Sequence, residues 1–142
     1  MRISEKGLAL IKSFEGCKLE AYQCSAGVWT VGFGHTGPEV ERGVVITADE
    51  AEMFLERDLA KFEKCVEGML LVKVTQGQFD ALVSFAFNLG CGALKGSTLL
   101  RLMNQEKPEE AALQFARWNK AGGKELAGLT RRRQAEAELF LS

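Results

Sequence analysis

The feature that most constrains the fold of this chain is a change in sequence character at about residue 47. Residues 16–46 contain six glycines with β-branched and aromatic residues between them, a composition typical of short strands joined by tight turns. On both sides of this segment the sequence has the apolar periodicity and the capping residues of helices. The sequence therefore predicts an α+β fold whose strands are confined to one small lobe.

Capping residues predict where the helices begin and end. A first helix is expected over residues 4–15, with Ser4 as its cap. Thr47 to Glu50 forms a capping-box pattern that opens a helix ending near Glu67. The remaining signals are a second capping box at Thr75 and Gln78, a stop at Gly90, a short helix after Gly96 and Ser97, Pro108 in a first turn, a break at Gly122 and Gly123, and a last helix from about Thr130.

The length and composition predict one globular domain over residues 1–142, with a β lobe at about 16–46 and a helical lobe that comprises residues from about 47 to 142 and the N-terminal helix. The single core favours a monomer. A net charge of −1 lacks the basic excess of proteins that bind nucleic acid. No apolar run approaches the roughly 18 residues of a membrane span, so synthesis in the cytoplasm without membrane insertion is expected.

The chain has four cysteines, at positions 17, 24, 65 and 91, and a single histidine. Without a CxxC pair or further histidines, neither a structural zinc site nor any other metal site is predicted, and no cofactor is expected. Four cysteines allow three disulfide pairings, and free thiols are the default expectation for a reducing cytosol.

Glu15 is the candidate general acid. It continues the apolar stripe of Leu8 and Ile11, and Gly16 ends the helix directly after it. Desolvation and the negative end of the helix dipole both predict a raised pKa, which suits a carboxyl group that donates a proton near neutral pH. On spacing alone, a surface carboxylate or an ion-pair partner of a buried arginine is the more common outcome.

A predicted hairpin brings a thiol and a hydroxyl together. In a strand over residues 29–35, alternation places Thr30, Gly32 and Gly34 on one face, where the glycines permit close approach of a ligand or another backbone. A turn centred on Gly27 would place Cys24 directly opposite Thr30 on that face. A cross-strand pair that only packs is an equally good interpretation.

The other conspicuous residues are assigned to structure rather than to chemistry. His35 is expected on the face opposite Thr30, where it stabilises the β lobe by hydrogen bonds, in preference to acting as a base for Cys24. The arginines at 131–133 are expected to form a solvated face, with an anion site as the alternative. Helical spacing assigns Phe79, Phe85 and Phe87 mostly to the core, and Trp118 is expected to be a buried anchor.

The chain resembles the phage-type lysozymes, the endolysin family of glycoside hydrolases. That family has a triad of Glu, eight residues, Asp or Cys, five residues and Thr, a spacing matched here by Glu15, Cys24 and Thr30. The similarity extends over nearly the whole chain, through FEG at 14–16, AYQC at 21–24, GVWTVGFGHT at 27–36, QFDALVSFAFNLG at 78–90, STLL at 97–100, Trp118 and GLTRRR at 128–133.

This resemblance implies a lysozyme-like fold with a cleft between a small β-hairpin lobe and a larger helical lobe. It implies a muramidase that hydrolyses the β-1,4 bond between N-acetylmuramic acid and N-acetylglucosamine in bacterial peptidoglycan. Glu15 would protonate the leaving oxygen, while Cys24 and Thr30 would position the attacking water. Sugar contacts are expected from cleft-lining residues of two further blocks, namely Phe87, Asn88, Ser97 and Thr98.

The main departure from the family pattern is Cys24, where many members have Asp. Cys17 has a spacing to Cys24 like that of relatives whose catalytic thiol is locked in an inhibitory disulfide. Those relatives carry a membrane anchor that is not seen here, so the protein is expected to reach the periplasmic wall through a holin-type pore. Cys65 and Cys91 could pair or simply fill space in the helical lobe.

Two other functions fit the same residues less well. A lytic transglycosylase needs one Glu and no water nucleophile, but the presence of Thr30 at the family spacing favours hydrolysis. A non-catalytic peptidoglycan-binding module is disfavoured by the intact Glu15. The product would separate the first alternative, because transglycosylation leaves a 1,6-anhydro sugar.

Overall fold

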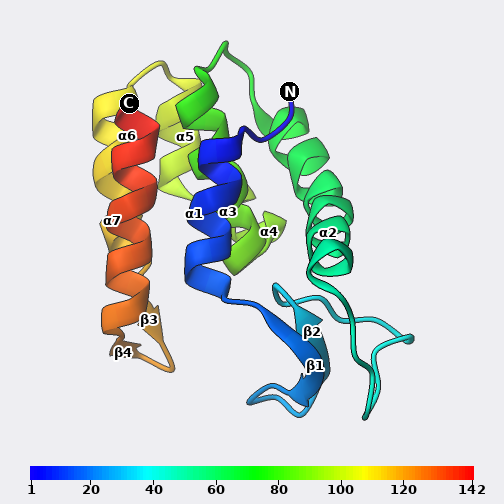
Figure 1. The fold of residues 1–142 in the computed structure, drawn as a ribbon. Helices are drawn as coiled ribbons and strands as arrows, with labels where there is room; N and C mark the ends of the chain where they lie inside the picture. The colour runs from blue at the N-terminus through cyan, green and yellow to red at the C-terminus, as the bar shows by residue number, and fades with distance from the viewer. The chain divides into compact units, whose positions relative to one another are not determined.

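The computed structural model describes all of residues 1–142 and confirms the predicted α+β class. It is mostly helical, with two short antiparallel hairpins (Figure 1). None of the helices combines the length and the hydropathy that a membrane span requires. In chain order the elements are α1 (Glu5–Glu15), β1 (Lys18–Gln23), β2 (Trp29–Gly32), α2 (Ala48–Met69), α3 (Gln76–Leu89), α4 (Cys91–Lys95), α5 (Thr98–Asn104), α6 (Pro108–Gln114), the 3-10 helix η1 (Phe115–Arg117), β3 (Lys120–Ala121), β4 (Lys124–Glu125) and α7 (Ala127–Leu141).

The predicted capping boxes are confirmed at the starts of α2 and α3. Thr47 Oγ1 accepts the Glu50 N–H at 3.1 Å, while the Glu50 carboxylate accepts the Thr47 N–H at 3.0 Å, so that both donors are satisfied before α2 begins. Thr75 and Gln78 form the same reciprocal pair at the start of α3. That helix ends at Gly90, which has a positive φ of 97°.

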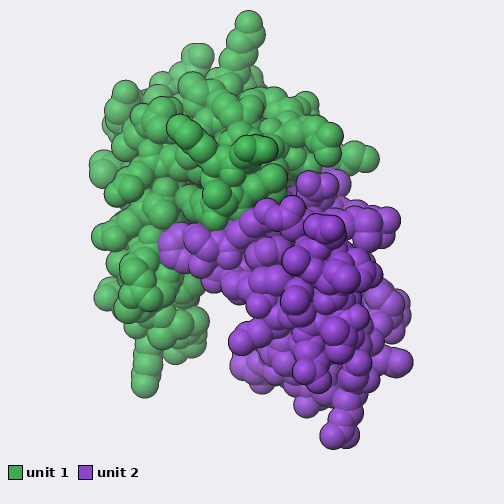
Figure 2. Space-filling view, viewed as in Figure 1, with its two compact units in different colours: residues 1–10, 62–142 green, residues 11–61 purple.

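The chain divides into two compact units (Figure 2). Unit 1 comprises Met1–Leu10 and Phe62–Ser142, and unit 2 comprises Ile11–Lys61. Unit 2 therefore contains the expected β lobe of residues 16–46 together with the last turns of α1 and the first part of α2. The boundaries fall within two helices, whereas the sequence places them where the composition changes.

Unit 2 is built on the β1–β2 hairpin and a small apolar cluster. The buried members of this cluster are Val31, Val40, Ile46 and Ala51. The second strand ends at Gly32, so the predicted strand over residues 29–35 is too long. Gly32 and Gly34 adopt φ values of 66° and 84°, and the chain folds back so that Val31 and His35 exchange two backbone hydrogen bonds of 2.9 Å. The assignment of faces by simple alternation consequently fails beyond Gly32.

Unit 1 is organised around α3. Its residues 79–86 are all buried, as expected for a helix that is surrounded by protein on every side. This helix packs most extensively against α7. Phe85 makes edge-to-face contacts with Phe115 at 5.8 Å and with Trp118 at 5.3 Å between ring centroids. The core positions of Phe79 and Phe85 are confirmed, whereas Trp118 is only half-buried.

A second hairpin in unit 1 corrects the prediction that all strands lie in one lobe. Strands β3 and β4 pair around Gly122 and Gly123, whose φ values of 58° and 79° suit a two-residue turn. Each strand has only two residues, so there is no alternation from which the sequence could predict it. The break at these glycines is confirmed, and α7 begins three residues before Thr130.

Two of the four cysteines form a disulfide, which makes the expectation of free thiols wrong for this pair. Cys65 in α2 and Cys91 at the start of α4 are bonded, with their Cα atoms 6.4 Å apart. They are 26 residues apart in sequence, and only the tertiary fold brings them within bonding range. Cys17 and Cys24 are free thiols, so the disulfide lock considered for them is not formed in this structure.

Candidate active site

Glu15 is the last residue of α1 and is half-buried. Gly16 follows with a φ of 68° and donates its N–H to the Lys12 carbonyl at 3.0 Å, which ends the helix. One carboxylate oxygen of Glu15, Oε1, lies 3.3 Å from the position that a Cβ on Gly34 would occupy. The structure thus brings the candidate acid against the turn after β2, and the missing side chain at Gly34 makes this approach possible.

Cys24 and Thr30 come together in a register that differs from the predicted one. The cross-strand partner of Thr30 is Tyr22, and the Cys24 N–H donates to the Val28 carbonyl at 3.0 Å. The hairpin is therefore centred on Ala26 and not on Gly27. Because the shift moves the cross-strand partner by two residues, and side chains alternate with a period of two, Cys24 and Thr30 still share one face. They are diagonal neighbours across the hairpin.

The pKa of the Cys24 thiol is lowered below its ordinary value. The largest cause is a hydrogen bond from the backbone of Val28, followed by one from the backbone of Ala26, while limited burial opposes the shift. The Thr30 hydroxyl also lowers this pKa. That hydroxyl donates to the Val28 carbonyl at 3.0 Å, and it has only one proton. A Cys24 thiolate would compete with the Val28 carbonyl for this proton, so the backbone hydrogen bonds of Val28 and Ala26 are the main support for the ionised thiol.

His35 is a buried structural histidine, as the sequence predicts. Its Nδ1 lies 2.8 Å from Asp58 Oδ2, its Nε2 lies 2.5 Å from Glu39 Oε1, and its ring stacks on Phe54 with centroids 4.3 Å apart. Burial lowers the pKa of His35, but the hydrogen bonds and charges of Glu39 and Asp58 outweigh it and raise the pKa overall. Since a carboxylate occupies each ring nitrogen, neither nitrogen is available as a base for Cys24.

The four predicted sugar contacts lie in unit 1, and their binding roles stay predictions. Phe87 is half-buried and packs edge-to-face on Phe62 with centroids 5.4 Å apart. Thr98, the first residue of α5, is half-buried as well. Ser97 is buried, and its hydroxyl donates to the Leu94 carbonyl at 2.6 Å while accepting the Leu100 N–H at 3.1 Å. The hydroxyl of Ser97 is thus engaged in capping α5.

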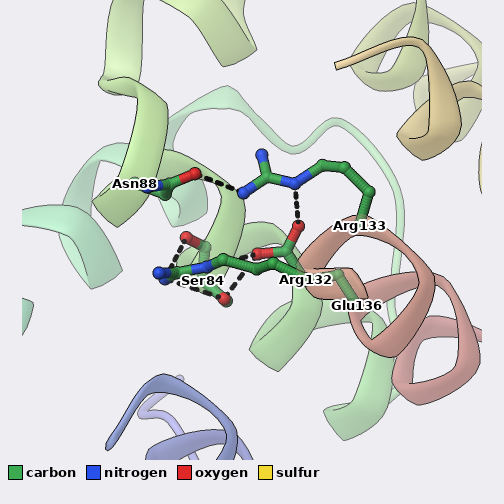
Figure 3. Close-up of polar contacts among 5 residues, drawn as sticks. All are labelled: Ser84, Asn88, Arg132, Arg133 and Glu136. Atoms are coloured by element: carbon green, nitrogen blue, oxygen red, sulfur yellow. Dashed lines mark hydrogen bonds and ion pairs between the residues drawn. The ribbon is translucent and has the colours of Figure 1, made fainter. Parts of the chain in front are cut away.

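The fourth predicted contact, Asn88, belongs to a buried polar cluster between α3 and α7 (Figure 3). Arg132 and Arg133 are only 4 % and 0 % exposed, so the prediction of a solvated arginine face holds only for Arg131. Both side chains pair with Glu136, which lies three and four residues further along α7 and is itself fully buried. This spacing of Glu136 is the signal that the sequence reasoning missed.

The comparisons place the chain in a family. The phage lysozyme family model matches residues 12–136. The endolysin of Bacillus phage B103 is 48 % identical over the whole chain, which spans about half (55 %) of that relative. The endolysin of Acyrthosiphon pisum secondary endosymbiont phage 1 is 47 % identical, and the match covers 100 % of this chain and 99 % of that endolysin. The muramidase domain of SpmX from Asticaccaulis excentricus superposes with a TM-score of 0.93 and 41 % identity, over 99 % of this chain and 98 % of that one. This chain is a member of the phage lysozyme family.

Proposed function

We propose that this protein is an endolysin-type muramidase that hydrolyses the β-1,4 bond between N-acetylmuramic acid and N-acetylglucosamine in bacterial peptidoglycan. The observation that carries the proposal is that unit 2 holds both Glu15, to which we give the role of acid, and the pair Cys24 and Thr30, to which we give the positioning of water. Glu15 packs on the Gly34 turn, and the Cys24 thiol and Thr30 hydroxyl lie together on the hairpin that leads into this turn. Membership of the phage lysozyme family supports the same reaction.

In this mechanism Glu15 donates its proton to the glycosidic oxygen as the bond to the leaving sugar breaks. The Cys24 sulfur and the Thr30 hydroxyl hold the water that attacks the opposite face of the sugar. A thiolate at Cys24 accepts a hydrogen bond from this water and places a negative charge near the oxocarbenium-like transition state. The amides of the hairpin turn that lower the pKa of Cys24 therefore let a cysteine replace the aspartate of other members.

The proposal includes where the enzyme acts. The substrate is the cell wall, so the protein works on the periplasmic side after release through a holin-type pore, and it works as a monomer. No cofactor or metal takes part in the proposed steps, because the acid, the acceptor and the water supply every proton transfer.

Product analysis tests the proposal. Purified Gram-negative peptidoglycan is digested and the soluble fragments are examined by mass spectrometry. Hydrolysis gives reducing-end muropeptides, whereas fragments lighter by one water, with 1,6-anhydro ends, would show a lytic transglycosylase. Intact peptidoglycan would favour a binding module without activity.

The Glu15→Gln variant links the products to the proposed acid. Glutamine has nearly the same shape but no proton to donate, so the protein should fold normally and lose activity by about 100-fold or more. Glu5→Gln is the matched control, because Glu5 is exposed in the first turn of the same helix. Lysis by Glu15→Gln at the rate of the unmodified protein would refute the assignment.

A further inference from the structure

Three contacts fix the position of Arg133 in unit 1, and Figure 3 shows two of them, those with Glu136 and Asn88. The Nε of Arg133 lies 3.0 Å from Glu136 Oε1, and its guanidinium carbon lies 5.2 Å from the centre of the Phe85 ring. Its Nη2 donates to the side-chain oxygen of Asn88, one helical turn after Ser84 on α3. Because Arg133 is 0 % exposed, its guanidinium has no solvent-filled space in which to adopt another orientation.

The carboxylate that holds Arg133 is itself held. The Ser84 hydroxyl donates to Glu136 Oε2 at 2.5 Å, and Arg132 Nε lies 3.4 Å from the same oxygen. Arg132 also donates to the Ser84 carbonyl at 3.3 Å. The side chains of α7 and α3 thus form a continuous set of polar contacts that ends at Asn88.

The contact with Arg133 determines which end of the Asn88 amide turns inward. A guanidinium has donors only, so it can bond to the amide oxygen but not to the amide NH2. The Nδ2 group of Asn88 then points away from Arg133. Asn88 is half-buried near the end of α3, so this face of unit 1 offers a pair of oriented N–H donors.

We propose that Arg133 is a positioning residue for substrate binding: it orients Asn88 so that the amide N–H groups meet acceptor oxygens of the amino sugars, such as the acetamido carbonyl. This inference rests on the proposed muramidase function. It gives a role to Arg133, which does not contact the sugar. It also predicts that Asn88 binds hydrogen-bond acceptors of the sugar in preference to donors. An amide that could rotate would present either its oxygen or its nitrogen to the sugar. Fixing one orientation on binding would then cost part of the binding free energy.

A purely structural role of the cluster makes a different prediction, and kinetics separate the two. Soluble, uncrosslinked peptidoglycan chains serve as substrate for the unmodified protein, Asn88→Ala, Arg133→Met and the double variant. Asn88→Ala should raise KM by about 2- to 12-fold, the worth of one hydrogen bond, with kcat nearly unchanged. Arg133→Met should also raise KM, but by no more than Asn88→Ala does. The double variant should match Asn88→Ala, because Arg133 has no effect without the amide it orients.

Two further variants distinguish an effect on binding from a loss of folding. Asn88→Asp keeps the contact with Arg133 as an ion pair but turns an acceptor outward, so KM should rise more than in Asn88→Ala while the thermal midpoint is retained. Arg131→Met is the matched control, since Arg131 is exposed on the same helix and should leave KM unchanged. Kinetics are measured at a temperature where circular dichroism shows every variant to be folded.

The outcomes separate the inference from the function beneath it. If the unmodified protein hydrolyses the chains but the KM effects of Asn88→Ala and Arg133→Met multiply in the double variant, Arg133 does not act through Asn88 and the inference fails alone. The inference also fails if Asn88→Asp binds as tightly as the unmodified protein. If the unmodified protein releases no reducing-end products, the proposed function and the inference fail together.

Discussion

The Oε1 atom of Glu15 lies 3.3 Å from the point where a Cβ on Gly34 would stand. A methyl group there would crowd the carboxylate, and alanine would also be strained at the φ of 84° that Gly34 adopts. We therefore expect Gly34→Ala to lose about 1–2 kcal/mol of unfolding free energy and, in addition, to displace Glu15 and lose most activity. Urea unfolding and a peptidoglycan lysis assay measure the two effects.

Gly43→Ala separates crowding from backbone strain. Gly43 has nearly the same φ, 87°, but nothing lies within 4 Å of its Cβ position. The Gly43→Ala variant should lose about as much unfolding free energy as Gly34→Ala but keep its lytic activity. If the two variants lose activity equally at a temperature where both are folded, the contact between Gly34 and Glu15 has no catalytic importance.

The hairpin shows how much of the site the sequence could predict. The sequence predicts Cys24 opposite Thr30, whereas the structure pairs Thr30 with Tyr22. Cys24 and Thr30 still share a face, because the difference of two residues is one full period of a strand. The extent of β2 was not predictable by alternation. Gly32 and Gly34 are compatible with a strand but allow the reversal that pairs Val31 with His35.

The arginines show where local rules fail. Three consecutive arginines at the start of a helix are usually solvated, but Arg132 and Arg133 are buried because Glu136, Ser84 and Asn88 supply acceptors from two helices. Such a cluster depends on α3 packing against α7, and the spacing of Glu136 from the arginines is the only local signal of it. The disulfide between Cys65 and Cys91 likewise depends on the tertiary fold.

Substitution of Cys24 tests its role beside the water. Aspartate supplies a negative charge at the same position, so Cys24→Asp should retain activity. Alanine supplies neither charge nor acceptor, and Cys24→Ala should lose most of it, about 10-fold or more if a charge-assisted hydrogen bond of about 1.5–3 kcal/mol is lost. Lysis rates measure both. Cys17→Ala is the control, because Cys17 is the other free thiol and is exposed. Full activity of Cys24→Ala would exclude a water-positioning role.

The disulfide between Cys65 and Cys91 should stabilise the protein by restricting its unfolded chain. For 26 residues of separation, chain entropy predicts about 3.5 kcal/mol. Reduction with dithiothreitol should lower the unfolding free energy by about this amount, as measured by urea unfolding of oxidised and reduced protein. Cys65→Ser/Cys91→Ser should show no response to the reductant, whereas Cys17→Ser/Cys24→Ser should respond fully. A reductant effect that persists without Cys65 and Cys91 would assign the stabilisation to another pair.

His35 should make stability fall as the pH rises above neutrality. Because Glu39 and Asp58 more than offset burial, the pKa of His35 is raised in the folded protein. A raised pKa contributes stability that is complete below the ordinary histidine value of about 6.5 and is lost as the pH rises through the folded pKa. The pH dependence from Glu39 has the opposite sign. Its pKa is lowered mainly by the hydrogen bond with His35, so its contribution to stability is lost as the pH falls through its pKa in the folded protein.

The stabilisation by His35 should therefore be greatest between the titrations of Glu39 and His35, at mildly acidic to neutral pH. The effect should be small, because Glu39 is exposed and water screens the pair. Urea unfolding at several values between pH 4 and 10 measures it, with His35→Asn removing the titrating group and Glu39→Gln retaining a hydrogen-bond acceptor without charge. Glu39→Gln should shift the alkaline loss to lower pH, since one of the two carboxylates that raise the pKa is gone. An alkaline loss of the same size in His35→Asn would show that another group causes it.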